Sequence, residues 1–277
     1  MKKISFLFLS VLILSCSSST ILKQKKIIEV QKSDGLQSFQ SKHLDENLPY
    51  KVILPENLKS IKDSLSLLVL LDGDDYSGIA QNVTSLYEFG EKISPTVILS
   101  LPSTKKSRWA YYTPTKDTTN VEEGFEDLYS RTGKFPQFAD FLGNELIPSI
   151  EKELGIKFEQ KTIFGHSLGG LGVLSFAVLR PELFQNYISA SPSTMYDQHF
   201  IFKTIEEKGI LQFDSMFLTA ALNDGNGYRE NVEWLKEYLD NHKLDNNQAV
   251  RSKIYKNETH ATSGLKSLID GLEFIGK

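Results

Sequence analysis

The stretch KTIFGHSLGGLGVLSFAVL, residues 161–179, decides the expected fold of this chain. It joins a short apolar run to an apolar segment of helical length that starts at Leu168. The letters GHSLG at 165–169 fit G-x-S-x-G, a pattern in which glycines permit a turn so tight that it pushes the serine Oγ beyond the sheet edge. We therefore predict a strand, a sharp turn and a helix, with a nucleophile at Ser167 rather than a serine in a glycine-rich loop.

A serine nucleophile needs a base that takes its proton near neutral pH, and histidine suits that task. The chain has five histidines. For four of them a structural role is a sufficient explanation. His43 falls in an expected early strand, His166 inside the turn and facing away from the serine, His199 at the start of a helix and His242 at the end of one. His260 alone falls in an expected loop between the last strand and the last helix, and it is our predicted base.

The acid that orients this base is expected between Ser167 and His260 in the chain, at the end of a strand. The segment FLTAALNDGNGYREN, residues 217–231, offers Asp224 directly after an apolar run and Glu230 at the start of the next expected helix. We favour Asp224. Glu230, or a Ser–His dyad that works without an acid, stays an alternative.

Backbone N–H groups are expected to hold the oxyanion. The N–H of Leu168 comes first, because it lies at a helix N-terminus, where N–H groups are unpaired and the dipole is positive. A second donor is expected after the strand LSLLVLLDG, residues 65–73, at Gly73 or Asp74. The carboxylates at 72, 74 and 75 lack the spacing of a calcium loop, so we expect no metal site there.

Elsewhere the chain alternates short apolar runs with amphipathic segments. The pattern predicts an early antiparallel pair, then strands that are apolar on both faces, and helices between them, one of them kinked at Pro148. The expected strands are 39–44, 50–55, 65–73, 96–102, 161–165, 186–191, 215–222 and 250–257, and the helices 78–92, 135–155, 168–179, 198–208, 228–242 and 264–276. This alternation predicts the α/β class, with a mostly parallel sheet covered by helices on both faces.

The N-terminal residues are expected to lie outside this fold. Residues 1–15 combine two lysines with an apolar run that is short for a bilayer, and ILSC at 13–16 resembles a bacterial lipobox. The resemblance implies a signal peptide over 1–15 and lipidation of Cys16, the only cysteine of the chain. Residues 16–26 read as a polar tether and 27–277 as one domain, so we expect an exported, membrane-tethered bacterial lipoprotein.

Composition excludes one class of partner. The chain has 31 Lys and Arg against 35 Asp and Glu, a net charge of −4, so it offers no general attraction to nucleic acid. The short cluster KQKK at 23–26 belongs to the expected tether.

Several stretches together resemble the esterase D/enterochelin esterase group of α/β-hydrolases. They are LLVLLDGDDY, SRWAYYTPT, GKFPQFADFLGNELIPSIEKEL and, most closely, TIFGHSLGGLGVL with RPELFQNYISASPS. The resemblance implies an α/β-hydrolase fold, with Ser167 as nucleophile, His260 as base and Asp224 as acid. The chain departs from the family pattern at Tyr111 or Ala110, where an aspartate is usual, and at Thr259, where a glycine is common.

The resemblance implies hydrolysis of carboxylic esters without a cofactor, on siderophore, feruloyl, acyl-sugar or similar small-molecule esters. Arg108, Trp109 and Tyr111, with Tyr112, are candidates to border the pocket, where an aromatic wall with one arginine would suit an aryl or anionic substrate; that they cap the core instead is the alternative. Two alternatives stay open: an acyltransferase with the same triad, and a surface-tethered binding protein without activity.

Overall fold

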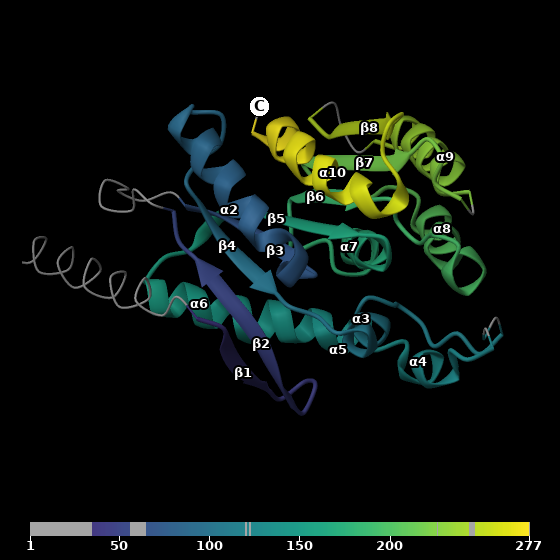
Figure 1. Ribbon diagram of the computed structural model, residues 1–277, viewed down its shortest axis with the longest axis horizontal. Helices are drawn as coiled ribbons and strands as arrows, with labels where there is room; N and C mark the ends of the chain where they lie inside the picture. The colour runs from purple at the N-terminus through teal and green to yellow at the C-terminus, as the bar shows by residue number, and fades with distance from the viewer. Residues whose placement is uncertain are drawn as a thin grey trace, which may run out of the picture.

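The computed structural model of the chain describes residues 35–55, 65–119, 121, 123–225, 227–243 and 247–276. In this part, the strands form one eight-stranded sheet in the order β1-β2-β4-β3-β5-β6-β7-β8 (Figure 1). The strands are β1 Gln37–Ser41, β2 Glu46–Ile53, β3 Leu65–Leu71, β4 Thr96–Leu101, β5 Phe158–His166, β6 Asn186–Ala190, β7 Ser215–Ala221 and β8 Ala249–Tyr255.

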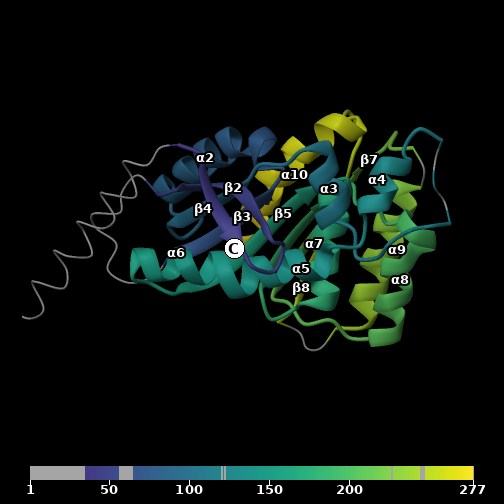
Figure 2. The ribbon, with the colours of Figure 1, turned by 90° about the horizontal axis from the view of Figure 1, so that it is seen from below.

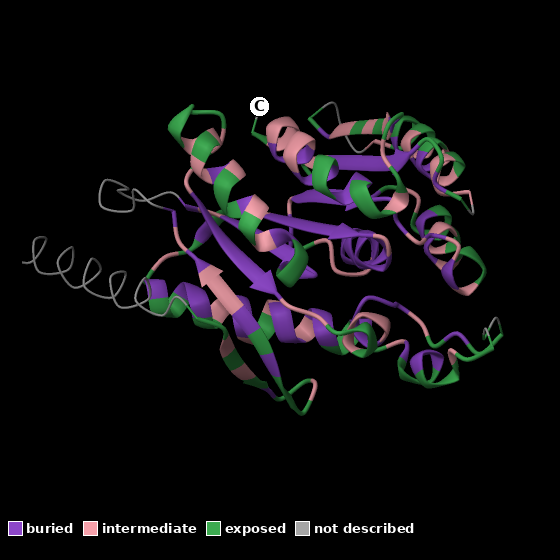
Figure 3. Cartoon of the chain, in the orientation of Figure 1, coloured by how far each residue is buried: buried purple, intermediate pink, exposed green. Residues whose placement is uncertain are grey.

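Most of this sheet is parallel. The six strands from β3 to β8 pair with one another only in parallel, whereas β1 and β2 form an antiparallel hairpin that joins the sheet edge at β4. The central strands are almost wholly apolar because both of their faces are covered, and Figure 3 shows them as buried ribbons. The expected α/β class with a mostly parallel sheet is confirmed.

Side chains alternate between two cores along the central strands. In β3, Leu67, Val69 and Leu71 pack into one core, and Leu68 and Leu70 pack into the other, as the two-residue period of a strand requires. The smaller core is closed by the helices α2, Gly73–Phe89, and α10, His260–Ile275.

The larger core is closed by the helices of the opposite face. These are α5 Phe135–Asp140, the π-helical turn η2 Phe141–Leu146, α6 Ile147–Leu154, α7 Leu168–Leu179, α8 Tyr196–Lys208 and α9 Tyr228–Asn241. Figure 2 shows α2 and α10 on one side of the sheet and α6 on the other. Because β3, β5, β6 and β7 are parallel neighbours, their carboxyl ends meet at one edge of the sheet, where ligands bind in such folds.

Four local expectations need correction. The helix over 135–155 widens into a π-helical turn before Pro148, which lets the helix absorb an extra residue and keep both ends packed. Two short helices were not predicted, α3 Lys105–Tyr111 and α4 Glu126–Arg131. His43 lies in the turn between β1 and β2, and His260 is the first residue of α10 rather than part of a loop.

The predicted signal peptide, lipidation site Cys16 and polar tether all lie outside the described residues. Among the helices that the structure describes, none is long and apolar enough to cross a membrane.

Candidate active site

Ser167 stands at a sharp turn between β5 and α7. Its backbone angles, φ 58° and ψ −116°, lie where residues other than glycine rarely occur. The turn closes tightly, because a Cβ on Gly165 would come within 2.3 Å of the carbonyl oxygen of Gly169. The Ser167 N–H donates to the carbonyl of Ala190 at 2.9 Å and so fastens the turn to the end of β6. The structure therefore holds this serine in the strained geometry of a nucleophile elbow.

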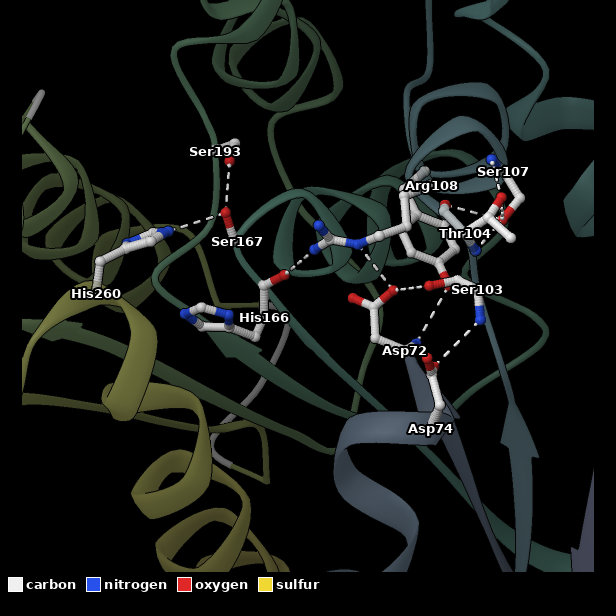
Figure 4. A network of polar contacts seen from close by, with 11 residues as sticks. Asp72, Asp74, Ser103, Thr104, Ser107, Arg108, His166, Ser167, Ser193 and His260 are labelled. Carbon is white, nitrogen blue, oxygen red and sulfur yellow. Dashed lines mark hydrogen bonds and ion pairs between the residues drawn. The ribbon is translucent and has the colours of Figure 1, made fainter. Parts of the chain in front are cut away.

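Three side chains from distant parts of the chain form one hydrogen-bonded line. The Nε2 of His260 lies 2.9 Å from the Ser167 Oγ, and its Nδ1 lies 2.6 Å from the Oδ1 of Asp224. Figure 4 shows His260 reaching Ser167 from the first turn of α10. Thr259 caps this helix in a capping box, so the residue that replaces the common glycine fixes the helix start that carries the histidine.

Buried hydroxyls hold Asp224, the predicted acid, in place. The Asp224 side chain is fully buried, and its Oδ2 accepts hydrogen bonds from the Ser191 Oγ at 2.6 Å and from the Ala221 N–H at 3.0 Å. The Ser191 hydroxyl also lies 3.0 Å from the Oγ of Ser263, which donates to the His260 carbonyl at 3.0 Å. The hydroxyl network thus joins Asp224 to the helix turn that carries His260.

Glu230, the alternative acid, does not reach His260. It is exposed at the start of α9 and pairs with its neighbour Arg229. Asp224 is therefore the carboxylate that the structure brings to the histidine.

His166 lies beneath the base. Its ring is buried, and its centroid lies 4.8 Å from that of His260. Burial, together with the neighbouring His260, lowers the pKa of His166 to about 4, so this ring is neutral at ordinary pH. Gly264 of α10 makes room for it, since a Cβ there would lie 3.0 Å from the His166 Cγ and 2.3 Å from the Tyr76 hydroxyl.

An ion pair between half-buried Arg108 and buried Asp72 flanks the serine on the other side. Asp72, which lies between β3 and α2, has a left-handed backbone with φ 55°, and its carboxylate accepts from the Arg108 Nε at 2.8 Å. Arg108 also donates to the His166 carbonyl at 3.4 Å, and Ser103 donates to the same Asp72 carboxylate (Figure 4). Burial raises the pKa of Asp72, and the guanidinium opposes that rise. The charge of Arg108 is thus largely taken up within the protein.

A cavity of about 430 Å³ opens at Ser167. The residues that line it are mostly aromatic or polar: Arg108, Trp109, Asp117, Tyr129, Ser167, Leu168, Ser193, Met195, Tyr196, Asp197 and Tyr228. Leu168 of the predicted oxyanion donors borders it, whereas Gly73 and Asp74 do not. Gly73 packs against β4, where a Cβ would meet the Ser100 Oγ at 2.1 Å, and the Asp74 carboxylate accepts from the Ser103 N–H at 3.2 Å.

Only two of the predicted substrate residues face this cavity. Arg108 and Trp109 line it, but Tyr111 lies in a second cavity, stacked on Phe138 at 5.4 Å with its hydroxyl bonded to Glu46. The expectation that Tyr111 borders the active site is wrong, because its ring fills the apolar space between α3 and α5. Tyr112 is buried, and its hydroxyl accepts from the Asp72 N–H at 3.2 Å.

Other cavity residues were missed by the sequence analysis. The Ser193 Oγ lies 3.4 Å from the Ser167 Oγ, and the Tyr228 ring centroid lies 4.6 Å from that of His260. Both follow strand ends, β6 and β7, which is the signal that could have found them. Asp117 and Asp197 carry no such signal.

Comparisons with known proteins agree with this arrangement. Residues 41–263 match the model of a family described as "Putative esterase". The chain is 46% identical to the Ferri-bacillibactin esterase BesA of Bacillus subtilis over 66 residues, and these residues cover 24% of this chain and 23% of that protein. It is 29% identical over 132 residues to the Apo-salmochelin esterase of Escherichia coli, 46% of this chain and 41% of that protein. The matches therefore span less than half of these relatives.

A solved structure extends the likeness over most of the chain. The IroE-like serine hydrolase from Shewanella oneidensis superposes with a TM-score of 0.75 at 25% identity, over 87% of this chain and 79% of that one.

Proposed function

We propose that this chain, which belongs to the "Putative esterase" family, hydrolyses carboxylic esters by covalent catalysis at Ser167. The observation that carries the proposal is the hydrogen-bonded line from Ser167 through His260 to buried Asp224. A nucleophile within reach of a base, with that base held by a third group, is the arrangement that activates a serine hydroxyl.

The reaction proceeds in two halves. The Ser167 Oγ attacks the ester carbonyl carbon while His260 Nε2 takes the hydroxyl proton, and the Leu168 N–H donates to the oxyanion. As the tetrahedral intermediate collapses, the C–O bond to the alcohol breaks and His260 returns the proton to the leaving oxygen. Water then attacks the acyl-enzyme and gives a proton to His260. When this second intermediate collapses, His260 returns the proton to the Ser167 Oγ, and the carboxylic acid product leaves. Asp224 keeps the imidazole in the required tautomer and balances its transient charge.

Siderophore esters are the substrate class we propose. Two relatives are esterases of siderophores by name, ferri-bacillibactin and apo-salmochelin. The cavity supports this class, because Trp109, Tyr129, Tyr196 and Tyr228 place aromatic rings around the scissile position. Assays with iron-free and iron-loaded siderophore esters, feruloyl sugars and acetylated sugars test the choice. Hydrolysis of the sugar esters without any siderophore ester would overturn it.

The mechanism is tested with p-nitrophenyl acetate and the full chain. Ser167→Ala and His260→Ala are each expected to lower kcat/KM by at least about a thousandfold, and Asp224→Asn by a comparable factor. Ser175→Ala is the matched control for the serine, because its buried hydroxyl donates within α7, to the Leu171 carbonyl at 2.8 Å, and lies away from the cavity lining.

Near wild-type turnover in Ser167→Ala or His260→Ala would refute the mechanism. If Asp224→Asn kept the wild-type rate while Glu230→Gln lost activity, Glu230 and not Asp224 would be the acid. A fluorophosphonate that labels the wild type and not Ser167→Ala would identify the nucleophile directly. Addition of an alcohol acceptor shows whether the acyl group passes to water or to the alcohol.

We further propose that Cys16 is lipidated and tethers the domain to a membrane of the cell envelope. The support is the sequence alone: a basic start, a short apolar run and ILSC at 13–16. A bacterial host fed a labelled fatty acid should label the wild type and leave Cys16→Ala unlabelled and released from the membrane fraction. Equal labelling of both would overturn the proposal.

A further inference from the structure

Two hydroxyl groups continue the hydrogen-bonded line at Ser167 into the cavity. The Ser193 Oγ lies 3.4 Å from the Ser167 Oγ, and the Tyr228 hydroxyl lies 3.4 Å from the Ser193 Oγ. Both residues line the cavity, and Figure 4 shows the Ser193 side chain pointing at Ser167. Neither hydroxyl takes part in the proton transfers between Ser167 and His260.

Both residues are held against the catalytic pair. Ser193 follows β6, and its N–H donates to the Ser167 carbonyl at 3.1 Å. Tyr228 is the first residue of α9, and its ring centroid lies 4.6 Å from that of His260. Because Ser167 gives its proton to His260, the Ser193 hydroxyl is the donor toward Ser167. Its proton therefore already points at the reacting centre.

The two hydroxyls make only long contacts. Hydrogen bonds between hydroxyl and carbonyl or hydroxyl oxygens are usually about 2.7–2.8 Å long. The Tyr196 hydroxyl, at the same cavity, donates to the Thr115 carbonyl at 2.8 Å. Within the described part of the chain, the hydroxyls of Ser193 and Tyr228 have no hydrogen bond shorter than 3.4 Å. Hydrogen bonds that serve catalysis are often long in the free enzyme and shorten in the transition state, so both hydroxyls are available to a substrate.

The leaving oxygen of an ester forms next to these hydroxyls. During acylation it is bonded to the same carbon as the Ser167 Oγ, and it takes its proton from His260 Nε2. It must therefore lie beside these two atoms, which are 2.9 Å apart in the free enzyme. Ser193 contacts Ser167 and Tyr228 packs against His260, so their hydroxyls border the position of the leaving oxygen. The carbonyl oxygen, in contrast, is assigned to the Leu168 N–H.

We propose that the Ser193 hydroxyl donates a hydrogen bond to the leaving oxygen, while the Tyr228 hydroxyl donates to the Ser193 Oγ and holds its proton toward the substrate. As the C–O bond breaks, its electron pair stays on the leaving oxygen, which receives a proton from His260. Ser193 and Tyr228 keep their own protons. Ser193 is then a catalytic residue, because it touches the reacting atoms, and Tyr228 is a positioning residue.

This arrangement specifies the alcohol part of the substrate. A donor contributes most where most negative charge develops, and the oxygen of a weakly acidic aliphatic alcohol carries more charge on leaving than that of an activated phenol. The site is therefore suited to esters of aliphatic alcohols. The role of Ser193 rests on the esterase function proposed above.

Acetate esters of p-nitrophenol, phenol, trifluoroethanol and ethanol test the proposal, because their leaving oxygens become steadily more basic while the acyl group stays the same. The kcat/KM of each ester reports the steps up to departure of the alcohol. Ser193→Ala should lower kcat/KM by about tenfold to a hundredfold for ethyl acetate and by less than about threefold for p-nitrophenyl acetate. Tyr228→Phe keeps the ring against His260 and should act in the same direction, by about three- to tenfold for ethyl acetate.

Each variant is compared by its own ratio of kcat/KM between two esters, so any loss of folded enzyme cancels. Tyr238→Phe is the matched control in α9, because its hydroxyl contacts the backbone carbonyls of Ile205 and Gly209 and lies away from the cavity lining. Ser175→Ala is the control for the serine, because its hydroxyl donates within α7. Both controls should keep the wild-type ratio.

Three results would overturn one part or the other. If Ser193→Ala lowered kcat/KM for all four esters by the same factor, or for none, the leaving-oxygen role would be refuted while the esterase function stands. A wild type that cleaves the two aryl esters but neither alkyl ester would refute the preference for aliphatic alcohols. A wild type that cleaves none of the four would refute the esterase function itself.

Discussion

His166 makes the stability of this domain depend on acid. The buried ring has a folded-state pKa of about 4, lowered from 6.5 by burial and by the neighbouring His260. In the unfolded chain the ring regains its ordinary pKa, so between these two values the unfolded state binds more protons than the folded state. Stability therefore falls as the pH drops from about 6.5 toward 4, and this contribution levels off below the folded-state pKa.

The size of the effect follows from the shift. Each pKa unit corresponds to about 1.4 kcal/mol, so the fall from 6.5 to about 4 removes about 3 kcal/mol of unfolding free energy. That is a large share of a typical stability of about 5–15 kcal/mol. Protonation would also place a cation under His260, at a ring separation of 4.8 Å.

Urea unfolding at several pH values between about 7 and 4 measures the effect. The wild type and His166→Asn are compared by the slope of their own stability against pH, so any loss common to all pH values cancels. The asparagine variant should lose about 3 kcal/mol less than the wild type over this range. His242→Asn is the control, because His242 is exposed at the end of α9, where its ring bonds to the Tyr238 carbonyl at 2.8 Å and stacks on the Tyr238 ring. Parallel slopes for the wild type and His166→Asn would refute the reasoning.

Two further predictions concern groups around the elbow. Ser191→Ala removes a donor to the buried Asp224 carboxylate, so kcat should fall about tenfold with little change in KM, and the unfolding free energy should fall by about 1–3 kcal/mol. Ser189→Ala is the control, because the buried Ser189 hydroxyl donates to the Gly170 carbonyl of α7 instead. This variant should keep kcat within about twofold. A kcat loss shared by both variants would show that Ser191 has no special part in positioning the acid. Gly165→Ala places a methyl group 2.3 Å from a backbone oxygen and should lower kcat/KM at least about a hundredfold by moving the elbow. Gly78→Ala in α2 is the control, because the added methyl group meets nothing within 4 Å, and this variant should gain up to about 1 kcal/mol of stability. A Gly165→Ala variant with wild-type activity and stability would contradict the steric argument.

The elbow and the order of the elements could be predicted from the residues alone. The glycines at 165 and 169 act on the backbone within five residues, and the apolar runs mark strands buried on both faces, so both signals are local. The helix expected over 168–179 has those bounds in the structure. His260 could be chosen because it alone stood near the end of the last strand, although its place on the first turn of α10 depends on the Thr259 cap.

The surroundings of the serine, in contrast, depend on how the whole chain folds. Arg108 and Tyr111 are three positions apart in α3, yet they line different cavities. Their directions depend on the side chains that pack around each of them, and the spacing in the sequence does not give this information. The charge of the cavity was equally hidden, since Thr115 and Asp197 meet across 82 positions and the Arg108 charge is balanced by Asp72, 36 positions away. A local pattern reports backbone preference and burial, whereas the field inside a cavity is the sum of charges that the fold brings together from the whole chain.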